Sequence, residues 1–528
     1  PGPAGQLHRA GRRSRRGRGG SAMSRVAVVG SGIGGLTAAL LLTRQGHEVV
    51  MYERAEQVGG RVAFEEQGGY RIDRGPTIVL LPEMLLDILE EGGLPRGSLE
   101  LLHCDPLYRV HFRSGRVLTK FAGAAEQAEE IDRLYPGEGK GFLRFMEDMS
   151  HLYPKGRASF LERGYKNGRE FFSPANVSLM VRLRAYRSLR SAVGQYFRNE
   201  ELRDAFSLQS LYIGGAPFRT PGIYTMLPYA EHAFGIWMLK GGYGTLPQII
   251  ARELEGRGVQ IHTSTEVDSL MVEGGRCRGV VVQDRQITYD AVLYNGDFPH
   301  IEKLLPSGVF KRDKNLAGTT NKTSSATDKP IRRGSFTPSS GCLLIYAAVS
   351  KRWPQSQVHQ FFLPDSLDSS LHEVFDRGQI PADSSYYVFN PVVLDDSAAP
   401  PGESILYFLV PVPAAPDKDW DDIAEALAVK VLRDAEKRGF PGLTASIVWR
   451  RLRTPGDARK EGMYGGGSFG IAPMLSQSGV FRPQPKPYPL QGLYAAGASV
   501  HPGGGVPIVM QGARLAVQEL IKEMSGHE

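Results

Sequence analysis

The chain has 528 residues, of which 41% are hydrophobic and 23% charged, values that are ordinary for a folded protein of two or more domains. Its net charge of +7 does not indicate nucleic-acid binding, because residues 1–22 alone contain six Arg and no acidic residue. The three cysteines, Cys104, Cys277 and Cys342, are too widely spaced for a disulfide framework or a metal site, which fits a reducing cytoplasm. No run of 18 apolar residues occurs, so we expect no membrane-spanning segment.

Residues 1–22 are rich in Gly and Arg and cannot build a hydrophobic core, so we expect a disordered tail. The segment lacks the apolar stretch of a secretory signal. Met23, directly before the first predicted strand, would be a natural start. An RNA-binding or targeting arm is an alternative that the sequence leaves open.

The first predicted unit is a strand, a Gly-rich turn and a helix. The apolar run Val26–Val29 is typical of a buried parallel strand, and residues 36–45 continue as a helix. The pattern Gly-x-Gly-x-x-Gly lies between them and is filled by Gly30, Gly32 and Gly35. Such glycines let the backbone approach a pyrophosphate at the helix N-terminus.

A second strand and an acid complete this unit. Residues 47–52 predict the strand, and Glu53 at its carboxyl end can accept a hydrogen bond from a ribose hydroxyl. A Gly-rich turn can also simply connect a strand to a helix, but the complete order of strand, turn, helix, strand and acid favours a dinucleotide site. A second Gly pair and an Arg follow at Gly59, Gly60 and Arg61, and a plain NAD site needs neither.

The following segments predict short strands and then helices. Residues 70–77 read Tyr-Arg-Ile-Asp-Arg-Gly-Pro-Thr, where Gly-Pro-Thr predicts a turn before a helix at 82–91. Residues 108–112 and 117–121 predict strands, and residues 125–234 predict a largely helical region.

One helical stretch, residues 171–199, contains no acidic residue. It carries five basic residues, Arg182, Arg184, Arg187, Arg190 and Arg198. Apolar side chains recur there at helical spacing, at Leu179, Leu183, Tyr186, Leu189, Val193 and Tyr196. A basic amphipathic helix of this kind can lie on an anionic bilayer. It can equally turn its apolar side to the core and its basic side to water, and the pattern alone leaves both open.

The second half of the chain first returns to the dinucleotide domain. Residues 235–244 predict a strand and a Gly-rich turn, and residues 246–255 predict a helix. Further strands are predicted at 259–264, 266–272, 279–283 and 287–294. The polar segment 311–340 has almost no large apolar side chain and predicts a mobile surface loop.

A second sheet and a closing helix are predicted towards the C-terminus. The sheet strands are expected at 343–349, 386–389 and 405–412, with a helix at 420–437. A last strand at 493–498 is followed by a Gly-rich turn and a helix from about Gly505 to Met524. Pro507 in the first turn suits a helix start, and the glycines before it let a planar group lie against bare backbone.

Three segments together resemble one enzyme family. They are the N-terminal unit with Asp73–Thr77, the return segment 235–242, and Gly-Ala-Ser-Val-His-Pro-Gly-Gly-Gly-Val-Pro at 497–507. They are similar to the phytoene desaturase-type carotenoid desaturases, and the likeness runs from Met23 almost to the C-terminus. Residues 160–163, 211–214 and 467–470, with His501 where sister oxygenases usually have Asn, are most similar to the C30, diapophytoene (dehydrosqualene) desaturase branch.

The resemblance implies an α/β fold with a discontinuous Rossmann-like FAD-binding domain of the glutathione reductase and amine oxidase type. Residues 23–95, 236–304 and 488–528 would form this domain. Residues 96–235 and 305–487 would form a mixed α+β substrate domain with a helical, membrane-facing region at about 125–234. The implied FAD contacts are Gly30, Gly32, Ile33, Gly34, Gly35, Glu53, Arg54, Gly60, Arg61, Gly75, Pro76, Thr77, Val267, Asn295, Gly497, Val506 and Pro507.

The resemblance also implies the chemistry. An allylic carbon of a linear C30 polyene would give a hydride to the flavin while a neighbouring carbon loses a proton, with oxygen or a membrane quinone as the electron acceptor. No metal is needed. His501 is the candidate base, although a structural hydrogen bond is its favoured interpretation, and Glu231 and His232 come after it. Because the substrate dissolves in membranes, the Arg-rich helix is expected to attach the protein to the cytoplasmic membrane face.

Three alternatives stay open. A diapolycopene oxygenase and a C40 phytoene desaturase would have the same fold. Rab GDP-dissociation inhibitors share it too, but they carry prenyl lipids without catalysis. Such a carrier needs neither a complete pyrophosphate turn nor Glu53, Gly60 and Arg61, all of which are intact here.

Overall fold

The computed structural model describes residues 23–306, 309 and 336–526. The predicted tail, 1–22, and most of the predicted loop, 311–335, lie outside these ranges. The loop prediction is wrong for its last residues, 336–340. Ser339 and Ser340 are buried there because the backbone pairs with the segment around Gly470 and Ile471.

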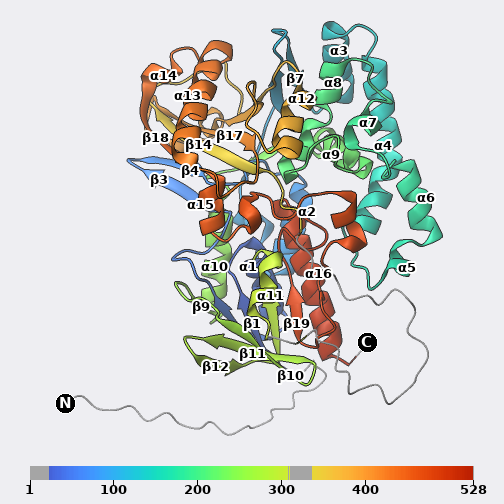
Figure 1. Cartoon of the computed structure of the whole chain (residues 1–528), viewed down its shortest axis with the longest axis vertical. Helices are drawn as coiled ribbons and strands as arrows, with labels where there is room; N and C mark the ends of the chain where they lie inside the picture. Colours follow the sequence, from blue (N-terminus) through green and yellow to red (C-terminus); the bar gives the residue numbers. More distant parts are fainter. Residues whose placement is uncertain (1–22, 307–308, 310–335, 527–528) are drawn as a thin grey trace.

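A five-stranded parallel sheet forms the lower half of the molecule in Figure 1. Its order is β19 (Leu493–Ala495), β13 (Ala291–Tyr294), β1 (Arg25–Val29), β2 (Glu48–Tyr52) and β9 (Gln260–His262). The β1 side chains alternate between two hydrophobic cores, with Val26 and Val28 in one and Ala27 and Val29 in the other. Burial on both faces explains why the strand reads as a continuous apolar run.

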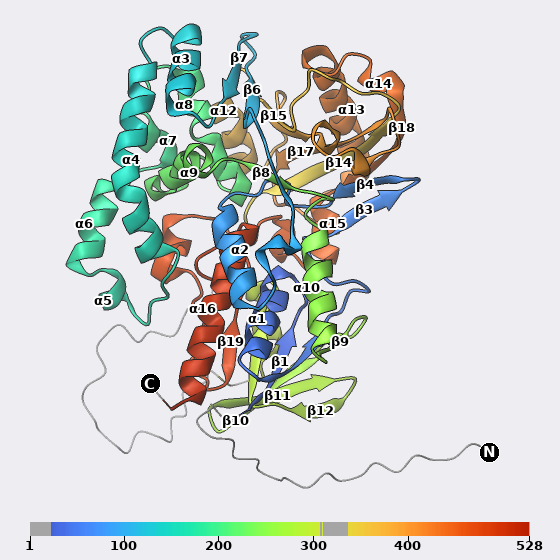
Figure 2. The same ribbon diagram turned by 180° about the vertical axis from the view of Figure 1, so that it is seen from behind.

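Helices cover one face of this sheet. They are α1 (Ile33–Arg44), α2 (Pro82–Glu91), α10 (Thr245–Gly256) and α16 (Val506–Met524), and α1 packs against both α16 and α10. All four lie within a few residues of the predicted helices. Figure 2 shows α16, α2, α1 and α10 side by side across this face of the molecule.

A small antiparallel sheet closes the opposite face. It consists of β10 (Ser269–Glu273), β11 (Arg276–Val282) and β12 (Arg285–Thr288). The prediction of one strand over 287–294 is wrong, because β12 pairs with β11 whereas β13 leaves to join the parallel sheet. The break falls at Tyr289 and Asp290, where Tyr289 packs into the core between the sheets.

A seven-stranded mixed sheet forms the upper half. Its order is β18 (Ile447–Arg453), β14 (Gly341–Val349), β17 (Ser404–Val412), β16 (Tyr386–Phe389), β15 (His359–Phe362), β6 (Tyr108–His111) and β7 (Val117–Lys120). One face packs under α13 (Trp420–Arg438), near α14 (Leu443–Ser446) and α15 (Pro455–Lys460). The other face, which carries Tyr346, Tyr387 and Tyr407, looks into the interior of the molecule. The sequence did not predict β15 or β18.

Two short two-stranded sheets and a helical region complete the fold. β3 (Phe64–Gln67) pairs with β4 (Tyr70–Asp73), and β5 (Leu101–His103) pairs with β8 (Trp237–Leu239). The helical region contains α3 (Ala124–Leu134), α4 (Gly139–Phe160), α5 (Gly168–Phe171), α6 (Pro174–Arg182), α7 (Leu189–Val193), α8 (Glu200–Ala205) and α9 (Met226–Phe234). The short helices α11 (Ile301–Leu304) and α12 (Leu367–His372) lie elsewhere in the chain.

The predicted basic helix over 171–199 is not continuous. It is broken between α6 and α7, where Arg184 adopts a left-handed backbone conformation and Ser188 caps the start of α7 through a bond from Ser191 N. The apolar stripe predicted there is buried in the core except at Tyr186. Within the part of the chain that the structure describes, no helix is long and apolar enough to cross a membrane.

Candidate functional site

The N-terminal turn is packed so closely that only glycine fits it. A Cβ at Gly35 would lie 2.1 Å from Gly30 O, and one at Gly34 would lie 2.4 Å from Asn295 Oδ1. Gly30 itself has a φ of +98°. Helix α1 begins after Gly32, with no side-chain cap and no acidic residue in its first turn. Its first N–H groups therefore remain available to a phosphate.

Glu53 is held in place at the end of β2. Its Oε2 accepts hydrogen bonds from Ser31 N at 2.8 Å and Ser31 Oγ at 3.0 Å, and its Oε1 accepts one from Ala55 N at 2.8 Å. Its carbonyl accepts from Thr265 N, which brings the segment with Val267 beside it. The carboxylate thus lies directly at the Gly-rich turn, as a ribose contact requires. Arg54, the next residue, is exposed.

Asp297 connects the second Gly pair to the C-terminal turn. Arg61 Nη2 lies 3.0 Å from Asp297 Oδ2, which also accepts a hydrogen bond from Tyr464 N at 2.9 Å. Ser499 Oγ donates to the other oxygen of Asp297. The sequence reasoning missed Asp297 as a site residue, although it lies two residues after the predicted contact Asn295.

Asp73 fixes the segment Gly75–Thr77 against the return segment. The buried carboxylate accepts hydrogen bonds from Tyr243 N at 3.0 Å and Gly244 N at 2.9 Å, at the start of α10. Burial raises its pKa to about 7, against the lowering effect of those two bonds. A Cβ at Gly75 would lie 2.5 Å from Arg61 O, so this turn and the second Gly pair touch through their backbones.

The C-terminal turn leaves open space in front of α16. Gly497, Gly503 and Gly505 all have positive φ, and a Cβ at Gly503 or Gly505 would meet no atom closer than 3.8 Å. Helix α16 has no side-chain cap, so the N–H groups of its first turn also remain available. Together with α1, this gives two helix N-termini and Gly-lined backbone, to which a nucleotide and a planar ring fit.

Asn295 has a buried polar atom that the described residues leave without a partner. Its Nδ2 donates to Gly30 O at 3.3 Å, but its buried Oδ1 has no hydrogen-bond partner among the described residues. That oxygen lies between the N-terminal and C-terminal turns. A buried acceptor of this kind is rare without a partner, so the residues present fit the predicted FAD.

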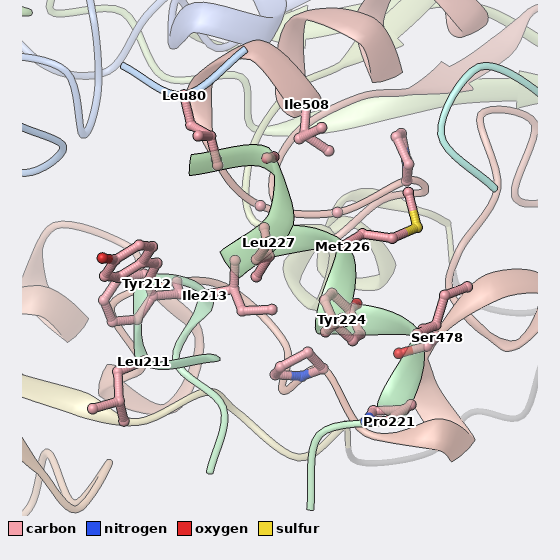
Figure 3. Close-up of a pocket in the computed structure, with 18 of the residues that line it drawn as sticks. Leu80, Leu211, Tyr212, Ile213, Pro221, Tyr224, Met226, Leu227, Ser478 and Ile508 are labelled. Carbon is pink, nitrogen blue, oxygen red and sulfur yellow. The ribbon is translucent and has the colours of Figure 1, made fainter. Parts of the chain in front are cut away.

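A cavity of about 350 Å³ begins at Gly75–Thr77 and the C-terminal turn and runs into the upper half of the molecule. Gly75–Thr77 and Gly503–Ile508 line one end of it, and most of its remaining lining is apolar or aromatic. Figure 3 shows Leu80 and Ile508 on one side of the cavity, away from Leu211 and Tyr212. Five of the predicted FAD contacts therefore border a deep apolar cavity: Gly75, Pro76, Thr77, Val506 and Pro507.

Part of the cavity lining reaches an exposed apolar surface, here called the mouth surface. The lining there includes Phe172, Leu475 and Phe481, which are 47%, 56% and 54% exposed. The ring centroids of Phe172 and Phe481 are 6.1 Å apart. Helix α6 adds exposed Val177 and Val181 beside them, completing the mouth surface.

The candidate bases have different surroundings. His501 lines the cavity, and its Nε2–H donates to Arg163 O at 2.8 Å, whereas its buried Nδ1 has no partner among the described residues. Burial lowers its pKa to about 4. Glu231 and His232 are buried behind the wall, where Glu231 accepts hydrogen bonds from Tyr108, Gln209 and Tyr212.

Several residues of the cavity wall could not be read from the sequence. Tyr212, Phe361 and Tyr387 come from distant segments that tertiary packing brings together, and Tyr387 forms a buried polar contact with Thr77. Buried Arg482 donates to the carbonyls of Ala498, Val500 and Gln477 and so holds the C-terminal turn. Successive side chains of β16 alternate between the two faces of the sheet, so Tyr387 packs in a different core from Tyr386 and Val388. This alternation is the one sequence signal that bears on the position of Tyr387. Among the described residues no cluster has the composition of a metal site.

Residues 33–521 match the family model of the flavin containing amine oxidoreductases. A solved structure of an oxidoreductase from Methanosarcina mazei has the same fold, with a TM-score of 0.63 and 18% identity over 94% of this chain and 100% of that one.

Three curated relatives are similar along nearly their whole length. They are a 4,4′-diapolycopen-4-al dehydrogenase from Metabacillus indicus (42% identity; 96% of this chain, 98% of that protein), a zeta-carotene-forming phytoene desaturase from Myxococcus xanthus (34%; 94% of each), and a 4,4′-diapophytoene desaturase from Staphylococcus aureus (30%; 95% and 99%).

Proposed function

The chain belongs to the flavin-containing amine oxidoreductase family, and we propose that it introduces double bonds into a linear C30 carotenoid of the 4,4′-diapophytoene type. It is an FAD-dependent oxidoreductase, which sets aside the non-enzymatic carrier. The products would be of the diaponeurosporene or diapolycopene type.

One observation carries this proposal: a deep apolar cavity meets the predicted FAD contacts at Gly75–Thr77, Val506 and Pro507. When bound, FAD supplies a two-electron acceptor for a hydride. Leu80 and Ile508 on one side, and Leu211 on the other, would hold an extended hydrocarbon in the cavity and exclude water. Because an apolar chain offers no polar handle, orientation must come from the shape of this wall.

Anaerobic turnover in liposomes tests the substrate. The FAD-loaded protein, incubated with diapophytoene, is expected to bleach its flavin absorbance and to yield pigments with more conjugated double bonds. C40 phytoene, offered in parallel, should react more slowly. If phytoene reacts faster, the C30 assignment is wrong, and if neither reacts, desaturation is wrong.

A second candidate follows from the Metabacillus relative, whose name specifies oxidation of a carotenoid aldehyde. This chain would then convert a terminal aldehyde of a C30 polyene into an acid. The same protein should be offered diapolycopenal. An acid product from the aldehyde, together with unchanged diapophytoene, would replace the desaturase proposal, whereas terminal aldehydes or alcohols formed from diapolycopene would indicate an oxygenase.

We also propose that the protein attaches to the cytoplasmic face of the membrane, where its substrate and a quinone acceptor would dissolve. The mouth surface supports this attachment, because its exposed apolar side chains lie at the cavity lining. Exposed Arg182 and Arg187 follow Val177 and Val181 of the mouth surface in the sequence. Oxygen is the alternative acceptor, and no nucleic acid is expected as a partner.

Liposome sedimentation tests this attachment. Reversing the charges of Arg182, Arg184 and Arg187 to Glu should weaken binding to anionic vesicles about 100-fold, because three cations near the surface contribute about 1 kcal/mol each. The FAD content should not change. Equal sedimentation of the variant and the parent protein would contradict a role for these arginines.

A further inference from the structure

A chain of three polar side chains begins in the mostly apolar wall of the cavity. The hydroxyls of Thr77 and Tyr387 are 2.7 Å apart, and the Tyr387 hydroxyl is 2.6 Å from His359 Nδ1. Thr77 and Tyr387 line the cavity, whereas His359 lies behind them and is fully buried. The chain starts within Gly75–Thr77, one of the segments predicted to touch FAD.

The imidazole at the end of this chain is a neutral proton acceptor. Burial alone lowers the pKa of His359 to about 3, and its ring is stacked between Tyr387 and Phe389. Burial also raises the pKa of Tyr387 well above its usual value. With both groups neutral, Tyr387 can donate its proton to Nδ1 and accept one at its own oxygen.

Other candidates on the cavity wall are less suited to this task. The Nε2–H of His501 is bonded to Arg163 O, and its Nδ1 is enclosed. Glu231 already accepts three hydrogen bonds and can be reached from the cavity only through the Tyr212 hydroxyl. Tyr212 has no contact with Gly75–Thr77 like the one that Tyr387 makes through Thr77.

We propose that Tyr387, backed by His359, accepts the proton that leaves the substrate during desaturation, an inference that rests on the proposed function. FAD, when bound, would supply the acceptor for the hydride that leaves one allylic carbon. The neighbouring C–H bond then breaks, its electron pair becomes the new double bond, and its proton goes to Tyr387 Oη as the phenol proton moves to His359 Nδ1. His359 is a positioning residue that acts through Tyr387.

A weak base is sufficient for this step. The carbon next to an allylic cation is strongly acidic, so even an imidazole of low basicity takes its proton downhill. The same low basicity keeps His359 uncharged while the apolar substrate enters, so no buried charge opposes binding. The proton can leave again through the same hydroxyl chain once the product has left and water enters the cavity.

The test compares Tyr387→Phe with Tyr346→Phe in the full-length, FAD-loaded protein. Tyr346 is a matched control: it is also buried on this face of the seven-stranded sheet, and it donates to Arg74 O at 2.8 Å outside the cavity lining. Tyr387→Phe should slow product formation about 100-fold, a typical contribution of a positioned base. Substrate deuterated at the carbon that loses the proton should then show a primary isotope effect that the parent protein lacks.

Two further measurements separate this role from a structural one. FAD content and the thermal midpoint should stay close to those of the parent protein. In protein labelled with ¹⁵N-histidine, a signal assigned through His359→Asn should indicate an unprotonated Nδ1, and Tyr387→Phe should shift that signal. If Nδ1 is the protonated nitrogen in the resting protein, the relay is wrong.

The remaining outcomes are equally decisive. If the parent protein does not desaturate diapophytoene, the proposed function fails before the relay is tested. If the parent protein is active and Tyr387→Phe matches it, the relay fails alone. If instead Tyr212→Phe is slowed and shows the isotope effect, the proton passes to Glu231 and our assignment is overturned.

Discussion

The turns predicted to bind FAD, here called the flavin end, and the cavity beyond them are held together by different kinds of contact. At the flavin end, backbone touches backbone: Gly35 approaches Gly30 O, and Gly75 approaches Arg61 O. In the cavity, side chains touch side chains, as Thr77 and Tyr387 do across 310 residues of sequence. The close backbone contacts require glycine, whereas the side-chain contacts can be made by many residue types.

This difference separates cofactor binding from substrate choice. A backbone cradle fits any chain that binds the same nucleotide, so it says little about the substrate. The cavity wall decides length and orientation through the sizes of its side chains. Substitutions at the flavin end should therefore remove FAD, and substitutions in the wall should change products while FAD stays bound.

The largest effect is expected for Gly35→Ala. Its Cβ would collide with Gly30 O and open the turn, so FAD binding should fall about 100-fold or more. Gly97→Ala is the matched control, because its Cβ meets nothing within 4 Å and its φ is not positive. Titration of the flavin-free protein with FAD measures both, and equal affinities would mean that close backbone approach does not matter here.

Asp297→Ala should have the next largest effect. It leaves Arg61, Ser499 Oγ and Tyr464 N without their shared acceptor, at a cost of about 2–3 kcal/mol if they stay dry. FAD affinity should fall roughly 10-fold to 100-fold, since two turns lose their connection. Asp297→Asn retains one acceptor oxygen and should lie between the parent and the Ala variant. A loss as large in Asn as in Ala would indicate that the charge alone matters.

In the cavity, Leu211→Ala should change the product pattern rather than the cofactor. Leu211 lines the wall and is only partly buried, so truncation should cost stability near the lower end of the range for core leucines, about 2 kcal/mol. The enlarged wall should admit longer or differently placed chains, which pigment chromatography detects. Loss of FAD from this variant would contradict the proposal that the flavin end binds the cofactor and the cavity wall selects the substrate.

The sequence predicted the FAD-binding turns better than the cavity wall, because backbone contacts and side-chain contacts leave different traces in a sequence. The glycines at 30, 32 and 35, the strand Val26–Val29 and helix α2 were all predicted close to where they are found, because backbone demands leave local patterns. The contact of Tyr387 with Thr77 could not be predicted, since β15 and β16 meet only through the tertiary fold. The division of 171–199 was missed because a left-handed residue at Arg184, a type that carries no Gly or Asn signal, breaks the helix.

The smallest effect concerns the mouth surface, whose side chains contact one another, as Phe172 and Phe481 do, yet leave much of their area exposed. Phe172→Ser and Phe481→Ser together should weaken binding to vesicles by several-fold without changing FAD content, because both rings are about half exposed and offer their area to lipid. Val448→Ser is the control, since Val448 is 55% exposed on β18, far from α5 and α6 in both views. Substrate supplied in detergent rather than vesicles should restore the rate of the double variant, because only delivery to the cavity is impaired. A rate that stays low in detergent would show that the two phenylalanines, which line the cavity, guide the substrate itself rather than only attach the protein to vesicles.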